Sequence, residues 1–310
     1  MKYRLGTRRS ELAKTQSTQV LEELKKAGLE CELVFIDSEG DKNHKDALYE
    51  FENATPGLFT KQLEVALLED RIDLAVHSLK DLPTDLPKSL LIGAITARVS
   101  TEDWLLIHFD AFDAQQPLFL KKGARVGSSS LRREAQLLEV RADLQVVAIR
   151  GNVPTRVTAV REKRVEATVL AAAGLLRLKL NLEGLHVLKL AEREFPPAPG
   201  QGALAIEIRD DASEELKIGL QKLHDLTSET ETRIERRVLK GLFGGCTLPL
   251  GVRCYKEGKL LKTKVFIGVL KDRKSVNKEW VGFHHFDISS QDEETLVDSI
   301  VQKAKGILNV

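Results

Sequence analysis

The chain has 310 residues, of which 42% are hydrophobic, so it can bury sizeable cores in two or three domains. Its 47 Lys and Arg residues nearly balance its 46 Asp and Glu residues. The resulting net charge of +1 argues against a global field that attracts nucleic acid or membranes. Any anion-binding site must therefore come from local clustering of arginine.

The cysteines and the apolar runs bear on the compartment. Cys31, Cys246 and Cys254 are odd in number and scattered, which is not the pattern of a secreted disulfide framework. The N-terminus lacks an apolar stretch of signal-peptide length, and the most apolar run, residues 165–176, is too short to span a bilayer. We therefore expect a soluble, cytoplasmic enzyme or binding protein.

The first hundred residues alternate strand and helix signals. Strands are expected at residues 2–6, 32–36, 74–77 and 91–95, and helices after Ser10 and at residues 59–70. This alternation predicts a doubly wound sheet, whose ligands lie beyond the carboxyl ends of its strands. Residues 38–56 are polar and without periodicity, which is typical of a functional lid or a mobile loop.

The pattern restarts near Thr101. Strands are expected at residues 104–107, 125–127, 145–149 and 168–171, and helices at residues 131–140 and from Val153, with Asn152 as its cap. The proline-rich residues 195–200 mark a boundary, and residues 203–208 are expected to be a strand that returns to the first sheet.

The last third predicts a different arrangement. Two helices, reaching residue 223 and spanning residues 228–240, precede strands at residues 250–255, 260–270 and 278–286. Their spacing is that of hairpins. A closing helix at residues 293–308 has a single apolar face.

Arginines gather where the predicted strands end. They are Arg8, Arg9, Arg132, Arg133, Arg150, Arg156 and Arg177. A guanidinium grips a carboxylate or phosphate with two parallel hydrogen bonds, and Ser128–Ser130 precede a helix whose N–H groups can bind an anion. Any one of these arginines is more simply a solvated surface residue, but the repetition at separate strand ends indicates an anion site.

Asp81 follows the predicted strand at residues 74–77, next to Lys80. A carboxylate in a cationic cleft stays ionised and can stabilise a cation that develops during a reaction. A turn-capping role is an equally good interpretation from chemistry alone. His77 is better interpreted as a packed strand residue.

Cys246 follows two glycines, an arrangement that gives access to a nucleophile or a covalent anchor. On spacing alone, a small buried cysteine is the simpler interpretation. Metal-ligand spacings are absent from the sequence, so we expect no metal. Nucleotide-binding glycine loops and the GxSxG motif are also absent, which argues against nucleotide cofactors and serine hydrolysis.

A set of ordered motifs resembles the porphobilinogen deaminase (hydroxymethylbilane synthase) family over residues 4–252. The motifs are GTRRS at residues 6–10, GLF at 57–59, LEVALL at 63–68, AVHSLKDLP at 75–83, GSSSLRR at 127–133, IRGNVPTR at 149–156, AAGL at 172–175, PGQGA at 199–203 and GGC at 244–246.

The resemblance implies three α/β domains: residues 1–98 with 199–215, residues 99–198, and residues 216–310. The first two would be doubly wound sheets resembling type II periplasmic binding proteins around a cleft. The third would be a small sheet of antiparallel strands packed by helices. The resemblance also suggests a monomer.

The resemblance implies a transferase of tetrapyrrole (haem) biosynthesis that condenses four porphobilinogen molecules and hydrolytically releases hydroxymethylbilane. Asp81 would be the catalytic residue. A dipyrromethane cofactor would be attached to Cys246. Further cofactor contacts would come from Ser78, Lys80, Asp81, Ser128, Ser130, Arg132, Arg133, Arg150 and Gly151. Substrate contacts would come from Arg8, Ser10, Arg150, Arg156 and Arg177.

One stretch departs from the family pattern. Many relatives carry lysines and glycines before the GLF motif, whereas residues 50–56 here hold two acids and no lysine. Lys42, Lys45 or Lys61 are the candidates to replace the lid contacts.

Two other function classes stay open from the residues alone. An anion-binding sensor of periplasmic-binding-protein fold would use the arginines but give no role to Cys246. A nucleic-acid binder would also use arginines, but the balanced charge and 5% aromatic content argue against it.

Overall fold

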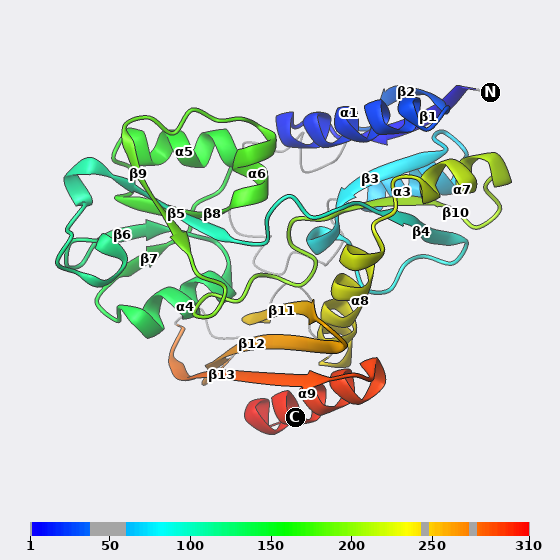
Figure 1. Cartoon of the computed structure of the whole chain (residues 1–310). Coiled ribbons are helices and arrows are strands. Elements are labelled where there is room, and N and C mark those ends of the chain that lie inside the picture. The colour runs from blue at the N-terminus through cyan, green and yellow to red at the C-terminus, as the bar shows by residue number, and fades with distance from the viewer. Residues whose placement is uncertain (1, 38–59, 243–247, 273–277, 310) are drawn as a thin grey trace. The chain divides into compact units, whose positions relative to one another are not determined.

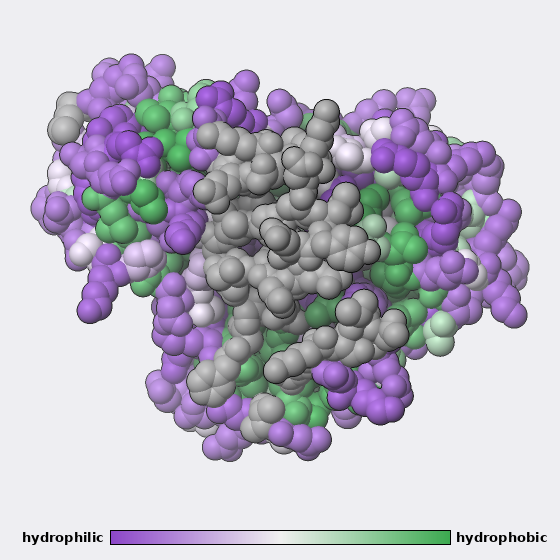
Figure 2. All heavy atoms as spheres, turned by 180° about the vertical axis from the view of Figure 1, so that it is seen from behind, coloured by the Kyte–Doolittle hydropathy of each residue, from purple (hydrophilic) through white to green (hydrophobic). Residues whose placement is uncertain are grey.

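The computed structural model describes residues 2–37, 60–242, 248–272 and 278–309 (Figure 1). The chain divides into two compact units. Unit 1 comprises Met1–Val99 and Gly202–Thr230, and unit 2 comprises Ser100–Gln201 and Glu231–Val310. Hydrophilic side chains cover most of the coloured surface in Figure 2, as expected for a chain with 30% charged residues.

Unit 1 is built on a five-stranded sheet of order β2-β1-β3-β10-β4. The strands are β1 (Lys2–Thr7), β2 (Glu30–Phe35), β3 (Leu74–Ser78), β4 (Leu90–Ile95) and β10 (Leu204–Arg209). β1, β2 and β3 run parallel, and β10 is antiparallel to β3 and β4. The expectation that the strand after the proline-rich stretch returns to the first sheet is confirmed.

Helices cover both faces of this sheet. They are α1 (Glu11–Lys26), α3 (Lys61–Leu68) and α7 (Glu214–Gln221). Val20 of α1 and Leu220 of α7 pack with Leu5, whereas Leu67 of α3 packs with Ala75 in a separate cluster. Successive strand residues alternate between the faces, so the sheet is doubly wound as predicted.

Unit 2 repeats this topology in a sheet of order β7-β6-β8-β5-β9. The strands are β5 (Asp103–His108), β6 (Arg125–Gly127), β7 (Gln145–Val147), β8 (Ala167–Ala171) and β9 (Leu185–Leu190). The helices are α4 (Leu131–Val140), α5 (Val153–Arg161) and α6 (Ala172–Arg177). In both sheets the antiparallel strand β10 or β5 lies fourth, and it is the strand next to the point where the chain changes unit.

A third sheet, β11-β12-β13, is antiparallel and belongs to unit 2. Its strands are β11 (Leu250–Glu257), β12 (Leu260–Leu270) and β13 (Trp280–Ser290), accompanied by α8 (Leu226–Gly241) and α9 (Glu293–Leu308). Val252, Val265 and Ile300 share its apolar core. The predicted small antiparallel sheet packed by helices is therefore present.

The domain boundaries given above stay predictions. Leu216 and Leu220 of α7 pack into the core of unit 1 with Leu29, although residues 216–310 were predicted to form a separate third domain. The strand β9 and the six-residue helix α6 were not predicted from the sequence. No helix among the described residues is both long and apolar enough to cross a membrane.

Candidate active site

The turn after β3 presents Asp81 on unit 1. β3 is buried from Leu74 to His77, and the chain then forms a 3-10 turn, Leu79–Asp81. The side chains on either side of the acid, Leu79 and Leu82, are 0% and 3% exposed. The Leu79 N–H also donates to the carbonyl oxygen of Ala203 at 3.1 Å. Buried leucines and a backbone bond thus hold the turn, while Asp81 itself is exposed.

The Asp81 carboxylate makes no hydrogen bond or ion pair with any other described residue. A turn-capping aspartate would accept a nearby backbone N–H. Within the described chain the fold does not use this carboxylate, which leaves it available to a ligand. Lys80, beside it, is half-buried.

The end of β1 contributes residues to the same edge of the sheet, because β1 and β3 are parallel neighbours. Arg8 is half-buried just after β1, and Ser10 caps α1 by accepting the Ala13 N–H at 3.3 Å. From α1, the Gln16 amide donates to the Ser78 hydroxyl at 2.9 Å. The predicted contacts Arg8, Ser10 and Ser78 therefore share one edge with Asp81.

Arg9 is already engaged in an exposed ion pair. Its Nε lies 2.6 Å from Oδ1 of Asp37, and its guanidinium lies over the Phe35 ring. His77, which was interpreted as a packed strand residue, is 5% exposed, and that interpretation is confirmed.

Unit 2 collects its predicted site residues at one edge of its own sheet. β6, β7 and β8 run parallel, so the segments that follow their carboxyl ends, residues 128–130, 148–152 and 172–177, meet there. β5 runs the other way, and its first residue, Asp103, pairs with Ala171 at the end of β8. The segments after these strands thus lie at the same edge of the sheet, while the convergence of their arginines on one ligand site stays a prediction.

The serines after β6 form a tightly bonded loop. Ser128 is buried, and its hydroxyl accepts the Ser130 N–H at 3.2 Å. Ser130 caps α4 by accepting the Arg133 N–H, and the Ser129 hydroxyl donates to the Ile149 carbonyl at 2.8 Å. These bonds fix the start of α4, the helix that carries Arg132 and Arg133.

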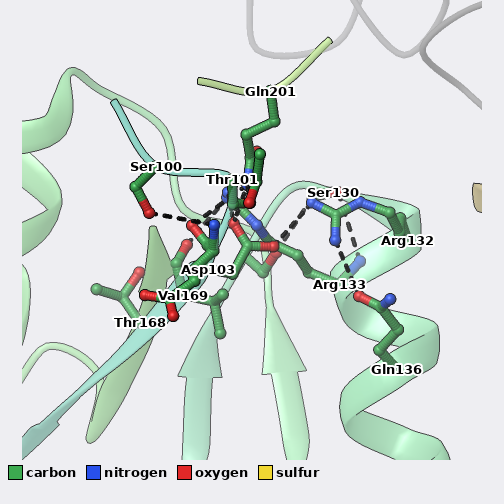
Figure 3. A network of polar contacts seen from close by, with 12 residues as sticks. Ser100, Thr101, Asp103, Ser130, Arg132, Arg133, Gln136, Thr168, Val169 and Gln201 are labelled. Atoms are coloured by element: carbon green, nitrogen blue, oxygen red, sulfur yellow. Dashed lines mark hydrogen bonds and ion pairs between the residues drawn. The ribbon is translucent and has the colours of Figure 1, made fainter. Parts of the chain in front are cut away.

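Arg132 and Arg133 are buried and share one carboxylate (Figure 3). Nη2 of Arg132 lies 2.8 Å from Oδ2 of Asp103, and Nη2 of Arg133 lies 2.7 Å from Oδ1. Nη1 of Arg132 donates to the Pro196 carbonyl and to Gln136, each at 3.0 Å. Burial lowers the pKa of Arg132, although the charge of Asp103 opposes that shift.

Four buried or half-buried arginines of unit 2, here called the arginine cluster, are Arg132, Arg133, Arg156 and Arg177. Nε of Arg133 is buried without a hydrogen-bond partner among the described residues. Burial, and then the charge of Arg133, lower the pKa of Arg156, and burial lowers the pKa of Arg177 to about 10. Cations with lowered pKa values are destabilised in their surroundings, so an anion placed among them is stabilised.

Arg150 and Gly151 form the turn before α5. Arg150 is exposed, and Gly151 has φ +107°, a backbone conformation that side chains rarely allow. The Gly151 carbonyl accepts from Nε of Arg156 at 2.9 Å. Asn152 caps α5 as predicted, accepting the Thr155 N–H at 2.9 Å.

Sequence reasoning missed Asp103 and Gln201, which is also buried. The Gln201 amide donates to Oδ1 of Asp103 at 3.0 Å and to the Thr101 carbonyl at 2.7 Å. An available signal was an acid at the head of an apolar strand, since a buried carboxylate needs a cation.

Two predictions fall outside the described residues. They are Cys246 and the lid at residues 38–56. The described residues on either side of residues 243–247, Leu242 and Leu248, are buried in one core cluster. Of the other thiols, Cys254 is buried, and burial raises the pKa of Cys31 to about 11, so neither is an activated nucleophile. The described residues contain no group of ligands that could hold a metal.

Comparisons with known sequences identify relatives over the whole chain. The family model described as "Porphobilinogen deaminase, dipyromethane cofactor binding domain" matches residues 3–217. A porphobilinogen deaminase of Nitratiruptor sp. is 38% identical, with 99% of this chain and 98% of the relative covered. That of Oceanobacillus iheyensis is 39% identical, with 98% and 96% covered.

The matches among solved structures are more distant than these sequence relatives. The methionine-binding protein MetQ matches with a TM-score of 0.43 and 14% identity, covering 74% of this chain and 92% of that one. The VFT2 domain of Bordetella pertussis BvgS, a double mutant, matches with a TM-score of 0.44 and 15% identity, covering 74% and 89%.

Proposed function

The chain belongs to the porphobilinogen deaminase family, and from this membership we propose that it condenses four porphobilinogen molecules head to tail and releases hydroxymethylbilane. It is then a transferase of tetrapyrrole and haem biosynthesis. Porphobilinogen is a pyrrole that carries an acetate, a propionate and an aminomethyl group. The site must therefore bind carboxylates and assist the departure of ammonia.

The observation that carries the proposal is the arginine cluster at the carboxyl edge of the unit 2 sheet. Arg132, Arg133 and Arg156 come from two helices that begin at this edge, and Arg177 ends a third. Guanidiniums favour carboxylates as ligands, because each can bind a carboxylate through two parallel hydrogen bonds. We assign the substrate carboxylates to Arg8, Arg150, Arg156 and Arg177, with Ser10 adding a hydrogen bond.

Asp81 supplies the chemistry in this proposal. Loss of ammonia leaves a cation delocalised over the pyrrole, and an ionised carboxylate near the ring nitrogen stabilises it. Two observations support this role: the Asp81 carboxylate is exposed and bonds to no other described residue, and its neighbours Leu79 and Leu82 are buried. Asp81 also accepts the pyrrole N–H, so it orients the ring while it stabilises the charge.

A dipyrromethane cofactor fits the residues present. Two linked pyrroles carry four carboxylates, and the buried Arg133 Nε without a described partner is a donor suited to one of them. When bound, the cofactor supplies the free α-carbon to which the first substrate is joined. We assign its further contacts to Ser78, Lys80, Asp81, Ser128, Ser130, Arg132, Arg133, Arg150 and Gly151.

We place the covalent attachment of the cofactor at Cys246, through a thioether. The other two thiols are poor candidates, because Cys254 is buried and the pKa of Cys31 is raised. The proposal also includes a cytoplasmic monomer that binds neither nucleic acid nor membranes. The non-catalytic sensor is not favoured, since relatives aligned over nearly the whole chain are deaminases by name.

Intact-protein mass spectrometry tests the attachment. Protein from cells supplied with porphobilinogen should carry the added mass of two linked pyrroles, and Cys246→Ser should lose it. Cys31→Ser and Cys254→Ser are the matched controls and should keep it. Loss of the mass in either control, or its retention in Cys246→Ser, would contradict the assignment.

A further inference from the structure

Asp103 lies at the centre of a buried network, and the proposed function gives Asp103 itself no role. It is 1% exposed and contacts both guanidiniums of α4 and the amide of Gln201 (Figure 3). A buried carboxylate of this kind is expensive to desolvate, and replacing such an ion cluster by apolar residues is often neutral or stabilising. Stability alone is therefore a weak reason for its presence.

The geometry of the network divides the carboxylate between the two arginines. Oδ2 of Asp103 accepts from Arg132 and Oδ1 accepts from Arg133, at 2.8 and 2.7 Å. Further hydrogen bonds orient each guanidinium, since Arg132 donates to the Pro196 carbonyl and Arg133 donates to the Val169 carbonyl, each at 3.0 Å. Both planar groups are therefore fixed before an anion arrives.

One carboxylate cannot neutralise two guanidiniums, so the three side chains keep a net positive charge. The Nε of Arg133 is buried and has no acceptor among the described residues, so it is the donor best suited to bind an anion. A pre-oriented donor binds an anion more tightly than a mobile one, because the ordering entropy is already spent. The network thus fixes the orientation of the donors and keeps a net positive charge.

Gln201 holds Asp103 in turn. Its amide nitrogen donates to the carboxylate and to the Thr101 carbonyl. Gln201 therefore connects the start and the end of the segment Ser100–Gln201 of unit 2. The neighbouring Gly200 N–H donates to Glu235 at 2.8 Å, and the same carboxylate accepts the Cys254 N–H of β11 at 2.9 Å. A single bonded chain therefore runs from β11 to the arginine pair.

We propose that Asp103 is a positioning residue that orients Arg132 and Arg133 for the carboxylates of the ligand, and that Gln201 fixes Asp103 in that role. The inference rests on the proposed function for the identity of the ligand, but not for the geometry of the network. In this proposal both residues act through the arginines and not on the reacting atoms.

The test compares Asp103→Asn and Asp103→Glu with the wild-type chain before any cofactor is loaded. Asp103→Asn removes the charge at constant size, whereas Asp103→Glu keeps the charge and moves it by one methylene. Asp143→Asn is the matched control, because Asp143 pairs with both Nε and Nη2 of the buried Arg141, at 2.7 and 2.8 Å, in the same unit.

The first measurement is NMR of ¹⁵N-labelled arginine side chains in the cofactor-free protein. Arg132 and Arg133 should give Nε–H signals that are dispersed and protected from exchange in the wild-type chain. Both signals should move to the position of mobile arginine in the two Asp103 variants but not in Asp143→Asn. Unchanged signals in both variants would overturn the proposal whatever the ligand is.

The second measurement is calorimetric binding of a pyrrole with acetate and propionate arms but no aminomethyl group, which cannot react. Both Asp103 variants should weaken its Kd by about tenfold or more, and Gln201→Ala by less. Wild-type affinity in Asp103→Glu would show that only the charge of Asp103 matters and would contradict the proposal that it orients the two arginines. If the wild-type chain does not bind this pyrrole, the proposed function is wrong, while the NMR result still decides the role of Asp103.

Discussion

The imidazole Nε2 of His77 on β3 lies 2.9 Å from Oε2 of Glu207 on β10, and the two side chains are 3% and 0% exposed. The pair connects β3 and β10 just before the turn that carries Asp81. In this register His77 lies opposite Ala205, and the Leu79 N–H donates to the Ala203 carbonyl. A buried polar pair of this kind fixes one register, because slipping the strands would leave both groups without a partner.

Removing both members of this pair should cost less stability than the two single losses added together. His77→Leu should lower the free energy of unfolding by about 3 kcal/mol, because it leaves the Glu207 carboxylate buried without its donor. In a double-mutant cycle by urea unfolding, the double variant with Leu at both positions should lose at least about 1 kcal/mol less than the sum of the single losses. Additive losses would show that the contact is incidental.

Glu64 on α3 provides a pH-dependent prediction. Its pKa is raised above the ordinary value of 4.5, first by burial and then by the charge of Glu207, while Thr60, His77 and Lys61 oppose the shift. An acid whose pKa is raised by folding binds its proton more tightly in the folded state. Its contribution is therefore most favourable below 4.5 and is lost as the pH rises through the folded pKa.

Glu64→Gln removes the ionisation and should change that profile. The stability of the variant relative to the wild-type chain should increase as the pH rises from about 4 towards neutrality and then level off. Urea unfolding at several pH values measures the difference. Parallel profiles for the two proteins would show that Glu64 does not change its proton affinity on folding.

Asp81→Asn should separate activity from stability. Asp81 is exposed and bonds to no other described residue, so the free energy of unfolding should stay within about 0.5 kcal/mol of the wild-type value. Turnover should fall by about 100-fold or more, because a neutral amide stabilises a cation poorly. Asp85→Asn, an exposed acid in the same loop, is the control and should keep its turnover. Near-normal turnover in Asp81→Asn would show that the reaction does not need the charge of Asp81.

The local elements were largely predictable because their signals lie within a few residues. α4 begins and ends where the sequence places it, since Ser130 caps it and the apolar stripe stops at Val140. The edge strand β9 and the short helix α6 were missed. A six-residue helix containing glycine has too few turns to show a period. The edge strand β9 exposes the apolar Val187, so its sequence does not alternate strictly between apolar and polar residues.

The site residues were predictable only in part, for a related reason. Strand-end arginines repeat along the chain, so their convergence follows from parallel topology. The Asp103 pairs join residues 29 and 30 positions apart, and the Gln201 bond joins residues 98 apart. Partners so distant in sequence are set by packing, and no local pattern records them.

Lysine substitutions should distinguish a buried from an exposed arginine. Arg132→Lys should lower the free energy of unfolding by about 2–4 kcal/mol, because a lysine cannot reach Asp103, Gln136 and Pro196 together. Arg150→Lys, at an exposed position, should leave stability within about 0.5 kcal/mol but raise KM. Urea unfolding and steady-state kinetics measure the two effects. A stable Arg132→Lys with wild-type kinetics would place Arg132 outside the carboxylate site.

Arg156→Gln should raise the free energy of unfolding of the cofactor-free chain and weaken its affinity for the ligand. The pKa of Arg156 is lowered by burial and by Arg133, so at neutral pH its charged form is disfavoured in the folded state relative to the unfolded one. A neutral side chain removes that penalty and should add about 1 kcal/mol, a size typical of surface-charge optimisation. Arg161→Gln, on the exposed side of the same helix, is the control and should not show this gain. Arg156→Gln should also weaken the Kd for the non-reactive pyrrole dicarboxylate by about tenfold. The reason is that an anion stabilises a desolvated cation more than a hydrated one. A variant that loses stability and keeps its affinity would show that Arg156 serves the fold instead of the ligand.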